Sequence, residues 1–532
     1  MATSRSLFGF VFANSLMLLL AAVALAQPAP PRPPASPATA EKPLNPIPPE
    51  KSKVTSHTMT LDGKEIHYTA TAGTLLIGDN DEQPNASMFY VAYTLDAPDA
   101  RSRPVTFLYN GGPGSASMWM HMGSVGPVRV VTSSPEATGP GPYQVVPNQY
   151  SLLDDSDLVF VDAVGTGYSR PVGKGAIKDF AGTDQDVRSF QKFIYRYVSV
   201  NHRWNSPKFL YGESYGTTRS AALLDALENS GMSFNGVILM STILNYFVQA
   251  PGTDNLFIGN LPSYAAIAWH YEKVSHKGRD QKAFLDEVRA FARGPYAEAL
   301  AQGHNLPEAQ VDSMAAKLSG YIGLSAQYIK EANLRIAPAR FRKELLRGQR
   351  EILGRYDARF EGTDADAAGE TPGYDPSNSG IEGAFITSLH AYLEGDLGYT
   401  SELTYLPSGP GINQAWDHTH RLGSALPIGG QGGRPMRDAY VAGDLADAMR
   451  KNPRLQVFSV NGLYDLATPF FITEYDLAHM ELEPKLRQNI HFAYYPSGHM
   501  IYLNVDALKQ LKSDLADFYA RAAPASEVRG SK

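Results

Sequence analysis

Ser214 is the residue of this chain whose surroundings point most directly to chemistry. It is the centre of the run Gly-Glu-Ser-Tyr-Gly at 212–216, between an apolar segment at 207–211 and a helix-forming segment at 217–224. A strand, a Gly-x-Ser-x-Gly run and a helix are typical of a nucleophile elbow, a tight turn that exposes the serine hydroxyl above a sheet. Only glycine tolerates the close backbone approach at both flanks. Ser214 is therefore the predicted nucleophile.

A base and a carboxylate are needed to activate a serine hydroxyl. Asp465 and His499 each follow an apolar run that reads as a strand, so both are expected in loops at strand ends. The order Ser, Asp, His along the chain is the order of the α/β-hydrolase fold. We predict a triad of Ser214, Asp465 and His499. Two other acids are nearby, but Asp476 is expected on a helix and Asp506 lies beyond the histidine.

A glycine-rich run, Asn-Gly-Gly-Pro-Gly-Ser-Ala-Ser at 110–117, follows the expected strand at 104–109. A phosphate cradle is disfavoured because no Lys or Arg follows the run directly. A loop here can instead direct a backbone N–H toward the nucleophile. An oxyanion needs two such donors, each contributing about 3–4 kcal/mol. The predicted donors are the N–H groups of Gly112 and Tyr215.

The elements that would position these residues are short apolar runs separated by helical stretches such as 183–198 and 217–229. The runs are 104–109, 157–161, 208–211, 236–240, 455–460 and 491–495. This alternation predicts a mostly parallel sheet with helices on both faces, whose ligands bind at the carboxyl ends of the strands. Before it, the segments 57–61, 64–70 and 87–95 are expected to be antiparallel strands, the first two joined at Asp62-Gly63.

Between residues 244 and 434 the alternation stops. Helices are predicted at 264–277, 279–293, 306–318, 325–336 and 338–353, and a polar loop at 364–380. The expected architecture is an α/β-hydrolase domain in two parts, 51–243 and 435–525, interrupted by a helical insertion, or cap, at 244–434.

The N-terminal region reads as a targeting segment. Residues 1–26 combine Arg5, an apolar stretch and Ala-Leu-Ala at 24–26, as a secretory signal peptide does. An uncleaved membrane anchor is the alternative, but the apolar run is short for a bilayer span. Residues 27–50 contain ten prolines and are expected to form a disordered linker. We therefore expect an exported protein, periplasmic or secreted, without stable membrane insertion after cleavage.

Composition excludes several classes of function. The chain has 532 residues and a net charge of -7 without a basic cluster, which argues against a nucleic-acid partner. It has no cysteine, so disulfides and cysteine nucleophiles are excluded; this fits a bacterial periplasm better than a eukaryotic secretory route. His418 and His420 could share a metal from one face of a strand, but a polar surface loop is the favoured interpretation. We predict no metal and no cofactor, and the oligomeric state is left open.

Four motifs, in order, resemble those of the serine carboxypeptidase family. They are the loop at 110–117, the run Asp-Ala-Val-Gly-Thr-Gly-Tyr-Ser at 162–169, the nucleophile run at 212–215 and Gly-His-Met at 498–500. The second is one residue shorter than in the family and lacks its proline. The resemblance covers roughly 104–240 and 455–505, and it implies a peptide substrate from which the last amino acid is released.

The resemblance also implies that Glu213, Asn110 and the backbone of Gly111 bind the terminal carboxylate of the substrate. Glu213 must then be protonated, because two carboxylates at hydrogen-bond distance cannot both be ionised. Activity is therefore expected at mildly acidic pH. A purely structural acid at a helix start is the other interpretation of Glu213.

The chain departs from the family at two positions near the site. Ser124 stands where the family usually has a second glutamate that shares a proton with the first, and Ser115 stands where eukaryotic members have a cysteine. His121 and Arg129 are the nearby residues that could hold a carboxylate instead. The departure keeps an esterase, amidase or acyltransferase as the alternative function. A non-catalytic binding protein is a further alternative, because a fold alone does not prove activity.

Overall fold

The computed structural model describes residues 45–80, 82–97, 102–274, 280–421 and 435–523. The expected signal peptide at 1–26 and the linker up to residue 44 lie outside the described residues. The last six residues of the expected linker are described, and they belong to the compact unit Leu44–Lys532. The Asn45 N–H donates to the carbonyl of Gly173 over 2.9 Å, and Arg196 forms an ion pair with Glu50 at 2.7 Å. These contacts are a correction to the disordered linker expected at this position.

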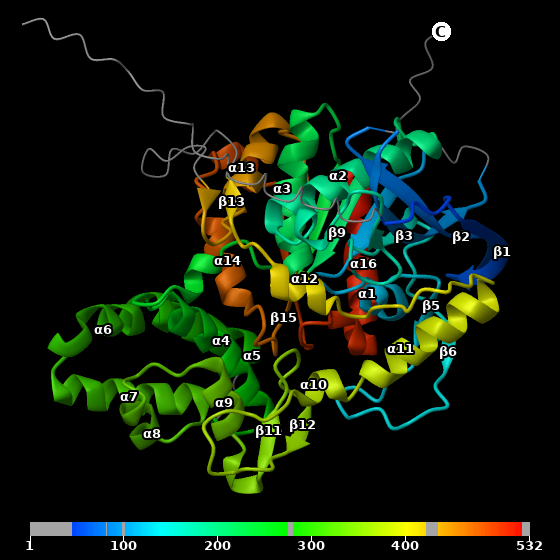
Figure 1. Ribbon diagram of the computed structural model, residues 1–532. Coiled ribbons are helices and arrows are strands. Elements are labelled where there is room, and N and C mark those ends of the chain that lie inside the picture. The colour runs from blue at the N-terminus through cyan, green and yellow to red at the C-terminus, as the bar shows by residue number, and fades with distance from the viewer. Residues whose placement is uncertain (1–44, 81, 98–101, 275–279, 422–434, 524–532) are drawn as a thin grey trace, which may run out of the picture. The chain divides into compact units, whose positions relative to one another are not determined.

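A ten-stranded sheet forms the centre of the described part of the chain (Figure 1). Its strands are β1 (Ser52–Leu61), β2 (Lys64–Gly78), β3 (Pro84–Leu95), β4 (Val105–Tyr109), β7 (Asp157–Val161), β8 (Arg170–Pro171), β9 (Lys208–Glu213), β10 (Gly236–Met240), β15 (Gln456–Gly462) and β16 (Ile490–Tyr495). The order is β1-β2-β3-β7-β4-β9-β10-β15-β16, with β8 paired to β3. From β7 to β16 all neighbours are parallel, whereas β1, β2, β3 and β7 pair antiparallel. The α/β-hydrolase fold predicted from the sequence is thus confirmed.

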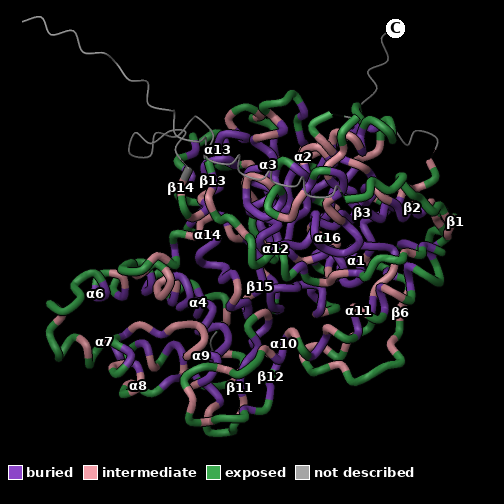
Figure 2. The backbone as a smooth tube through the Cα atoms, viewed as in Figure 1, coloured by how far each residue is buried: buried purple, intermediate pink, exposed green. Residues whose placement is uncertain are grey.

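Helices cover both faces of the sheet. One face packs against α1 (Met118–Gly123), α11 (Glu382–Ala391) and α16 (Val505–Ala522), and the other against α2 (Thr183–Val200), α3 (Tyr215–Asn229) and α13 (Ala442–Lys451). Along β10, Ile238 and Met240 face the first set of helices, while Val237 and Leu239 face the second. Since both faces are covered, the parallel strands are continuous apolar runs (Figure 2).

Between β10 and β15 a group of helices builds a hydrophobic core of its own. These are α4 (Asn255–His270), α5 (Gln281–Phe291), α6 (Ala297–Gln302), α7 (Glu308–Ile322), α8 (Ala326–Glu331) and α9 (Pro338–Glu344). Tyr464, Leu466 and Phe470, from the segment after β15, pack into the same core. The insertion therefore touches the chain close to Asp465.

The helices predicted at 279–293, 306–318 and 325–336 correspond to α5, α7 and α8 with other bounds, and the two remaining predicted helices differ more. The predicted helix at 264–277 is α4, which starts at Asn255 and contains Pro262. Burial of residues 259–268 outweighs the single backbone hydrogen bond that a proline removes. The predicted helix at 338–353 ends at Glu344; a 3₁₀ turn at Arg347–Gln349 follows, and Arg350, with a left-handed backbone of φ 59°, leads into strand β11 (Glu351–Leu353).

Short elements complete the described fold. They are β5 (Val128–Val130), β6 (Val145–Pro147), β12 (Glu361–Thr363), α10 (Pro376–Ser379), α12 (Pro410–Ala415), β13 (His420–Arg421), β14 (Pro435–Met436), α14 (Phe470–Ala478) and α15 (Pro484–Arg487). The polar loop predicted at 364–380 thus ends in a helical turn, α10, which Asp375 caps by accepting the Ser377 N–H. Across the described ranges, we find no helix with both the length and the apolar character needed to cross a membrane.

Candidate active site

Ser214 occupies a strained turn between β9 and α3. Its φ of 61° and ψ of -130° are unusual for a residue with a side chain. The turn is held by the Ser214 N–H, which donates to the Met240 carbonyl over 2.9 Å. A Cβ on Gly212 would lie 2.2 Å from the carbonyl oxygen of Gly216. Gly212 is therefore required for the backbone to close this turn, and a Cβ on Gly216 would lie 2.9 Å from the Tyr109 carbonyl oxygen.

Asp465 and His499 meet at the carboxyl ends of β15 and β16. The His499 Nδ1 atom lies 2.8 Å from Asp465 Oδ2, and both side chains are buried. Asp465 Oδ2 also accepts the Thr468 hydroxyl over 2.7 Å, and Oδ1 accepts the N–H groups of Ala467 and Thr468. Because both oxygens of the Asp465 carboxylate accept two hydrogen bonds each, the carboxylate is fixed in one orientation toward the imidazole.

The two groups shift one another's titration. Burial alone would raise the pKa of Asp465, but the attraction of His499 and the bonds from Thr468 outweigh it, so the pKa is lowered. Burial alone would lower the pKa of His499, but Asp465 outweighs it and the pKa is raised. The arrangement therefore stabilises an imidazolium, the state that follows proton removal from a nucleophile.

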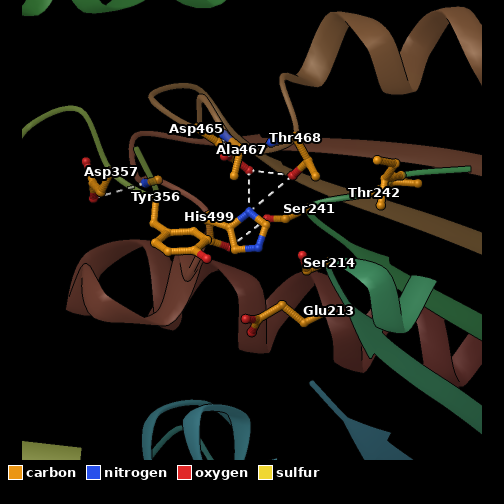
Figure 3. Close-up of polar contacts among 12 residues, drawn as sticks. Glu213, Ser214, Ser241, Thr242, Tyr356, Asp357, Asp465, Ala467, Thr468 and His499 are labelled. Carbon is orange, nitrogen blue, oxygen red and sulfur yellow. Dashed lines mark hydrogen bonds and ion pairs between the residues drawn. The ribbon is translucent and has the colours of Figure 1, made fainter. Parts of the chain in front are cut away.

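Figure 3 shows the second ring nitrogen of His499 turned toward the Ser214 hydroxyl. Within the described ranges, Ser214 Oγ makes no hydrogen bond. Bonds between a nucleophile and its base are often long without substrate and tighten when substrate binds. The structure thus brings together the three residues of the predicted triad, with the hydroxyl unengaged.

The loop at 110–117 lies directly over the elbow. A Cβ on Gly111 would lie 2.4 Å from the Tyr215 backbone nitrogen and 2.6 Å from that of Gly216. Only glycine at position 111 therefore lets the loop approach the elbow this closely. Gly112 follows with a φ of 103°, a conformation suited to glycine. The two predicted oxyanion donors thus belong to segments in contact.

Glu213 is buried next to the nucleophile. Asn110 Nδ2 donates to its Oε1 over 2.8 Å, while Oε2 is buried without a well-aligned hydrogen bond from any described residue. Burial raises the pKa of Glu213 to about 7, against the opposing effects of His499, Tyr502 and Asn110. The carboxyl group is thus largely neutral below pH 7, and the Tyr502 hydroxyl lies next to it.

The backbone of Asn110 is held in place by a buried ion pair. Arg219 Nη1 donates to the Asn110 carbonyl over 2.9 Å, and Arg219 Nε binds Asp186 at 2.7 Å. The Asn110 side-chain oxygen accepts the Met120 N–H over 2.9 Å. A buried pair of this kind contributes more to position than to stability. Nothing in the motifs of the sequence indicates this support.

The run at 162–169 braces the same loop. Asp162 Oδ1 accepts the Ser117 N–H over 2.7 Å, and burial raises the pKa of this carboxyl to about 6. A Cβ on Gly167 would lie 1.7 Å from Asp162 Oδ2, so only glycine fits there. The motif is therefore a support of the loop at 110–117.

A segment of the insertion holds both catalytic loops. The His499 N–H donates to the Tyr356 carbonyl over 2.6 Å, and the Leu466 N–H donates to the Arg355 carbonyl over 3.1 Å. Asp357 Oδ2 accepts the Gly498 N–H over 3.2 Å and forms an ion pair with Arg359 at 2.6 Å. The sequence did not indicate these residues. Thr468 was within reach of sequence reasoning, since it follows Asp465 by three residues in one loop.

Ser124, at the position of the missing glutamate, and the two residues suggested as substitutes for it, His121 and Arg129, make other contacts. Ser124 is buried and its hydroxyl donates to the Met120 carbonyl over 2.6 Å. His121 is buried against Tyr93, 2.6 Å away, and burial lowers its pKa to about 3, so it is neutral. Arg129 lies on β5, which pairs with β6 and not with the central sheet. Ser115 donates its hydroxyl to the Ala116 carbonyl.

His420 is not part of a polar surface loop, which is a correction to the sequence analysis. It is buried between Asp184, 2.6 Å away, and Asp444, 2.9 Å away, while His418 is exposed. Burial alone would lower the pKa of His420, but the two carboxylates raise it to about 9. His420, on β13, is therefore a charged residue that connects β13 to α2 and α13. In the described part of the chain there is no cluster of possible metal ligands.

Comparison with known proteins gives a match to the serine carboxypeptidase family over residues 65–276. The pheromone-processing carboxypeptidase KEX1 of Cryptococcus gattii is 30% identical over 220 residues, which are 39% of this chain and 31% of that protein. Serine carboxypeptidase-like 29 of Arabidopsis thaliana is 28% identical over 178 residues, 32% of this chain and 34% of that protein. The chain thus spans about a third of the length of the curated relatives it matches.

Solved structures resemble the chain only weakly. Proline iminopeptidase of Mycobacterium smegmatis has a TM-score of 0.37 and 13% identity, over 84% of this chain and 98% of that one. The peroxisomal α/β-hydrolase Lpx1 of Saccharomyces cerevisiae has a TM-score of 0.31 and 10% identity, over 88% and 89%. Likeness at this level supports no assignment of function.

Three of the four motifs, at 110–117, 162–169 and 212–215, lie within the residues that match the family. The fourth, at 498–500, contributes the histidine that meets Asp465. The resemblance of this chain to the serine carboxypeptidase family is therefore confirmed across residues 65–276.

Proposed function

We propose that this chain is an exported serine carboxypeptidase that releases the C-terminal amino acid of peptides. Ser214 Oγ attacks the last peptide carbonyl while His499 takes the hydroxyl proton. The tetrahedral oxyanion is held by the N–H groups of Gly112 and Tyr215. His499 then gives its proton to the leaving amine, and an acyl-enzyme remains. Water, deprotonated by His499, hydrolyses the acyl-enzyme and restores the Ser214 hydroxyl.

Asp465 has no proton of its own to transfer in this scheme. Its carboxylate fixes the imidazole with Nδ1–H toward itself and Nε2 toward Ser214, and it stabilises the imidazolium that forms in each step. The 2.8 Å contact between Asp465 and His499 and the saturation of the carboxylate by Thr468 support this role.

The observation that carries the proposal is the environment of Glu213. A carboxypeptidase must recognise a negatively charged end, which a neutral carboxyl group beside the nucleophile can do. A carboxyl group with a pKa of about 7 donates a hydrogen bond to a carboxylate at mildly acidic pH, and Asn110 and the Gly111 backbone flank it. One oxygen of Glu213 is still without a well-aligned partner among the described residues.

The test is digestion of one defined peptide, followed over time by mass spectrometry. A carboxypeptidase removes residues one at a time from the C-terminus and is slowed when that end is amidated. The Ser214→Ala variant is the matched control and should neither digest the peptide nor react with a fluorophosphonate probe. Internal cleavage by the wild-type protein would contradict the proposal.

An esterase, amidase or acyltransferase is the second candidate. Ser124 favours it, because the site has one acid where the family usually has two. Parallel assays of N-blocked dipeptides, peptides with a free amine and simple esters separate the candidates. Hydrolysis confined to esters would exclude the peptidase.

Export follows from residues 1–26, read as a signal peptide. N-terminal sequencing of protein recovered after expression with a secretion pathway should start at or near Gln27. An N-terminus that still contains residues 1–26, in a membrane fraction, would instead indicate an uncleaved anchor.

A further inference from the structure

Arg355 is a cation beside the candidate active site with no acidic partner. It follows strand β11 in the insertion and is exposed. Its Nη1 atom lies 3.5 Å from the Tyr356 hydroxyl, and its guanidinium carbon lies 5.3 Å from the centre of the Tyr356 ring. Within the described ranges no carboxylate forms an ion pair with it. The charge is therefore available for a ligand.

Tyr356 places this charge next to the catalytic histidine. The Tyr356 ring lies 5.2 Å from the His499 ring, centre to centre. Figure 3 shows the Tyr356 hydroxyl turned to the side of the imidazole on which Glu213 and Ser214 lie. Arg355 lies against that hydroxyl, and its guanidinium is close enough to His499 for its charge to oppose the rise of the His499 pKa.

The backbone around Arg355 is held in place. Its carbonyl accepts the Leu466 N–H over 3.1 Å, and its N–H donates to Asp375 Oδ1 over 2.9 Å. The Tyr356 carbonyl accepts the His499 N–H over 2.6 Å. Because the segment is bonded to the loops of both Asp465 and His499, the backbone of Arg355 is held beside these two loops.

A cation at this place would complement the neutral groups of the site in binding a substrate carboxylate. Glu213 and Asn110 offer neutral hydrogen bonds to a carboxylate, Ser124 removes the second acid of the family, and His121 is neutral and buried against Tyr93. A guanidinium offers two parallel N–H donors that match a carboxylate. The Tyr356 ring packs against the guanidinium. This contact restricts the Arg355 side chain before the ligand binds, so less conformational freedom is lost on binding.

We propose that Arg355, supported by Tyr356, binds the terminal carboxylate of the substrate opposite Glu213. This inference rests on the proposed carboxypeptidase function and names a specificity residue that the four sequence motifs do not contain. In this arrangement Arg355 supplies the positive charge, and Glu213 and Asn110 supply neutral hydrogen-bond donors. The charge of Arg355 compensates for the second glutamate of the family, which is Ser124 in this chain.

The test compares Arg355→Gln, Arg355→Lys and a control, Arg454→Gln. Arg454 is exposed and precedes β15, at the amino end of the strand whose carboxyl end leads to Asp465. Each protein is assayed with an N-blocked dipeptide that ends in a free carboxylate and with its C-terminal amide. Arg355→Gln should raise KM for the carboxylate about tenfold, with kcat little changed and the amide unaffected. Arg355→Lys should recover part of the loss, because it keeps the charge but not the paired donors.

Labelling of Ser214 by a fluorophosphonate probe shows whether each variant is folded and active. Equal losses on carboxylate and amide substrates, with slower labelling, would mean that Arg355 only supports the fold, which overturns the inference. Unchanged kinetics would overturn it too. If wild-type protein does not prefer the carboxylate, the proposed function fails and the inference fails with it. A preference that Arg355→Gln retains would overturn the inference alone.

Discussion

Replacing Glu213 by glutamine tests the central element of the proposed site. Glutamine has nearly the same shape and keeps a hydrogen-bond donor, but it cannot ionise. In the wild-type protein, Glu213 donates to a substrate carboxylate only while it is protonated, and burial raises its pKa to about 7. The substrate carboxylate, with a pKa of roughly 3.5, is ionised throughout the neutral range.

The expected magnitude follows from that pKa. The protonated fraction of Glu213 falls from roughly 0.9 at pH 6 to roughly 0.1 at pH 8. The apparent affinity of a ligand that binds only the protonated form scales with this fraction. The KM of wild-type protein for a peptide with a free C-terminus should therefore rise about tenfold from pH 6 to pH 8. The Glu213→Gln variant should show a flat KM over this interval.

The assay is the initial rate of hydrolysis at several substrate concentrations and five or more pH values, so that KM and kcat are separated. His499 titrates in both proteins and interacts with Glu213, so the wild-type protein and Glu213→Gln are compared at each pH. Asp162→Asn is the control, because burial raises the pKa of Asp162 to about 6 and this group could otherwise explain the curve. The reasoning is refuted if Glu213→Gln keeps the rise in KM, or if Asp162→Asn removes it.

Three further results are expected. Asp465→Asn should lower kcat by about 10⁴, as expected when the imidazole loses its orientation, while the exposed Asp506→Asn should have no effect; the reverse would identify another catalytic acid. Gly111→Ala should lower kcat by about 10²–10³ because its Cβ would lie 2.4 Å from the Tyr215 nitrogen; near-normal rates would exclude that N–H as an oxyanion donor. His420→Gln should reduce stability to urea at pH 6 but much less at pH 10. Folding raises the pKa of His420 from 6.5 to about 9, so the charged histidine contributes about 3 kcal/mol to the free energy of unfolding. This contribution is fully present below pH 6.5 and is lost as the pH rises through 9. Equal losses at both pH values would show that the charge of His420 contributes nothing.

Local features of the sequence were sufficient to predict the sheet and the residues at its strand ends. The strands predicted at 157–161 and 236–240 are β7 and β10 with identical bounds. Such strands are buried on both faces, so they appear as unbroken apolar runs that need no knowledge of their neighbours. The residues that follow them are at the carboxyl edge for the same reason, which is why Asp465 and His499 could be matched with Ser214.

The insertion was less predictable, because its segments depend on contacts distant in sequence. Strand β11 and the early end of α9 follow from pairing with β12, and helix α4 tolerates Pro262 only because it is buried. Arg355 and Tyr356 have no motif, since their place beside His499 results from backbone bonds between residues more than 100 positions apart.

The sequence by itself determined which chemical groups are present and their order along the chain: a serine between glycines, a carboxylate and an imidazole at strand ends, and a glycine-rich loop. The tertiary structure alone decided their charge states. Glu213 has a pKa of about 7, His121 is neutral and His420 is charged because of what surrounds each group. Desolvation and Coulomb energy depend on distance and burial, which residue type and spacing do not contain.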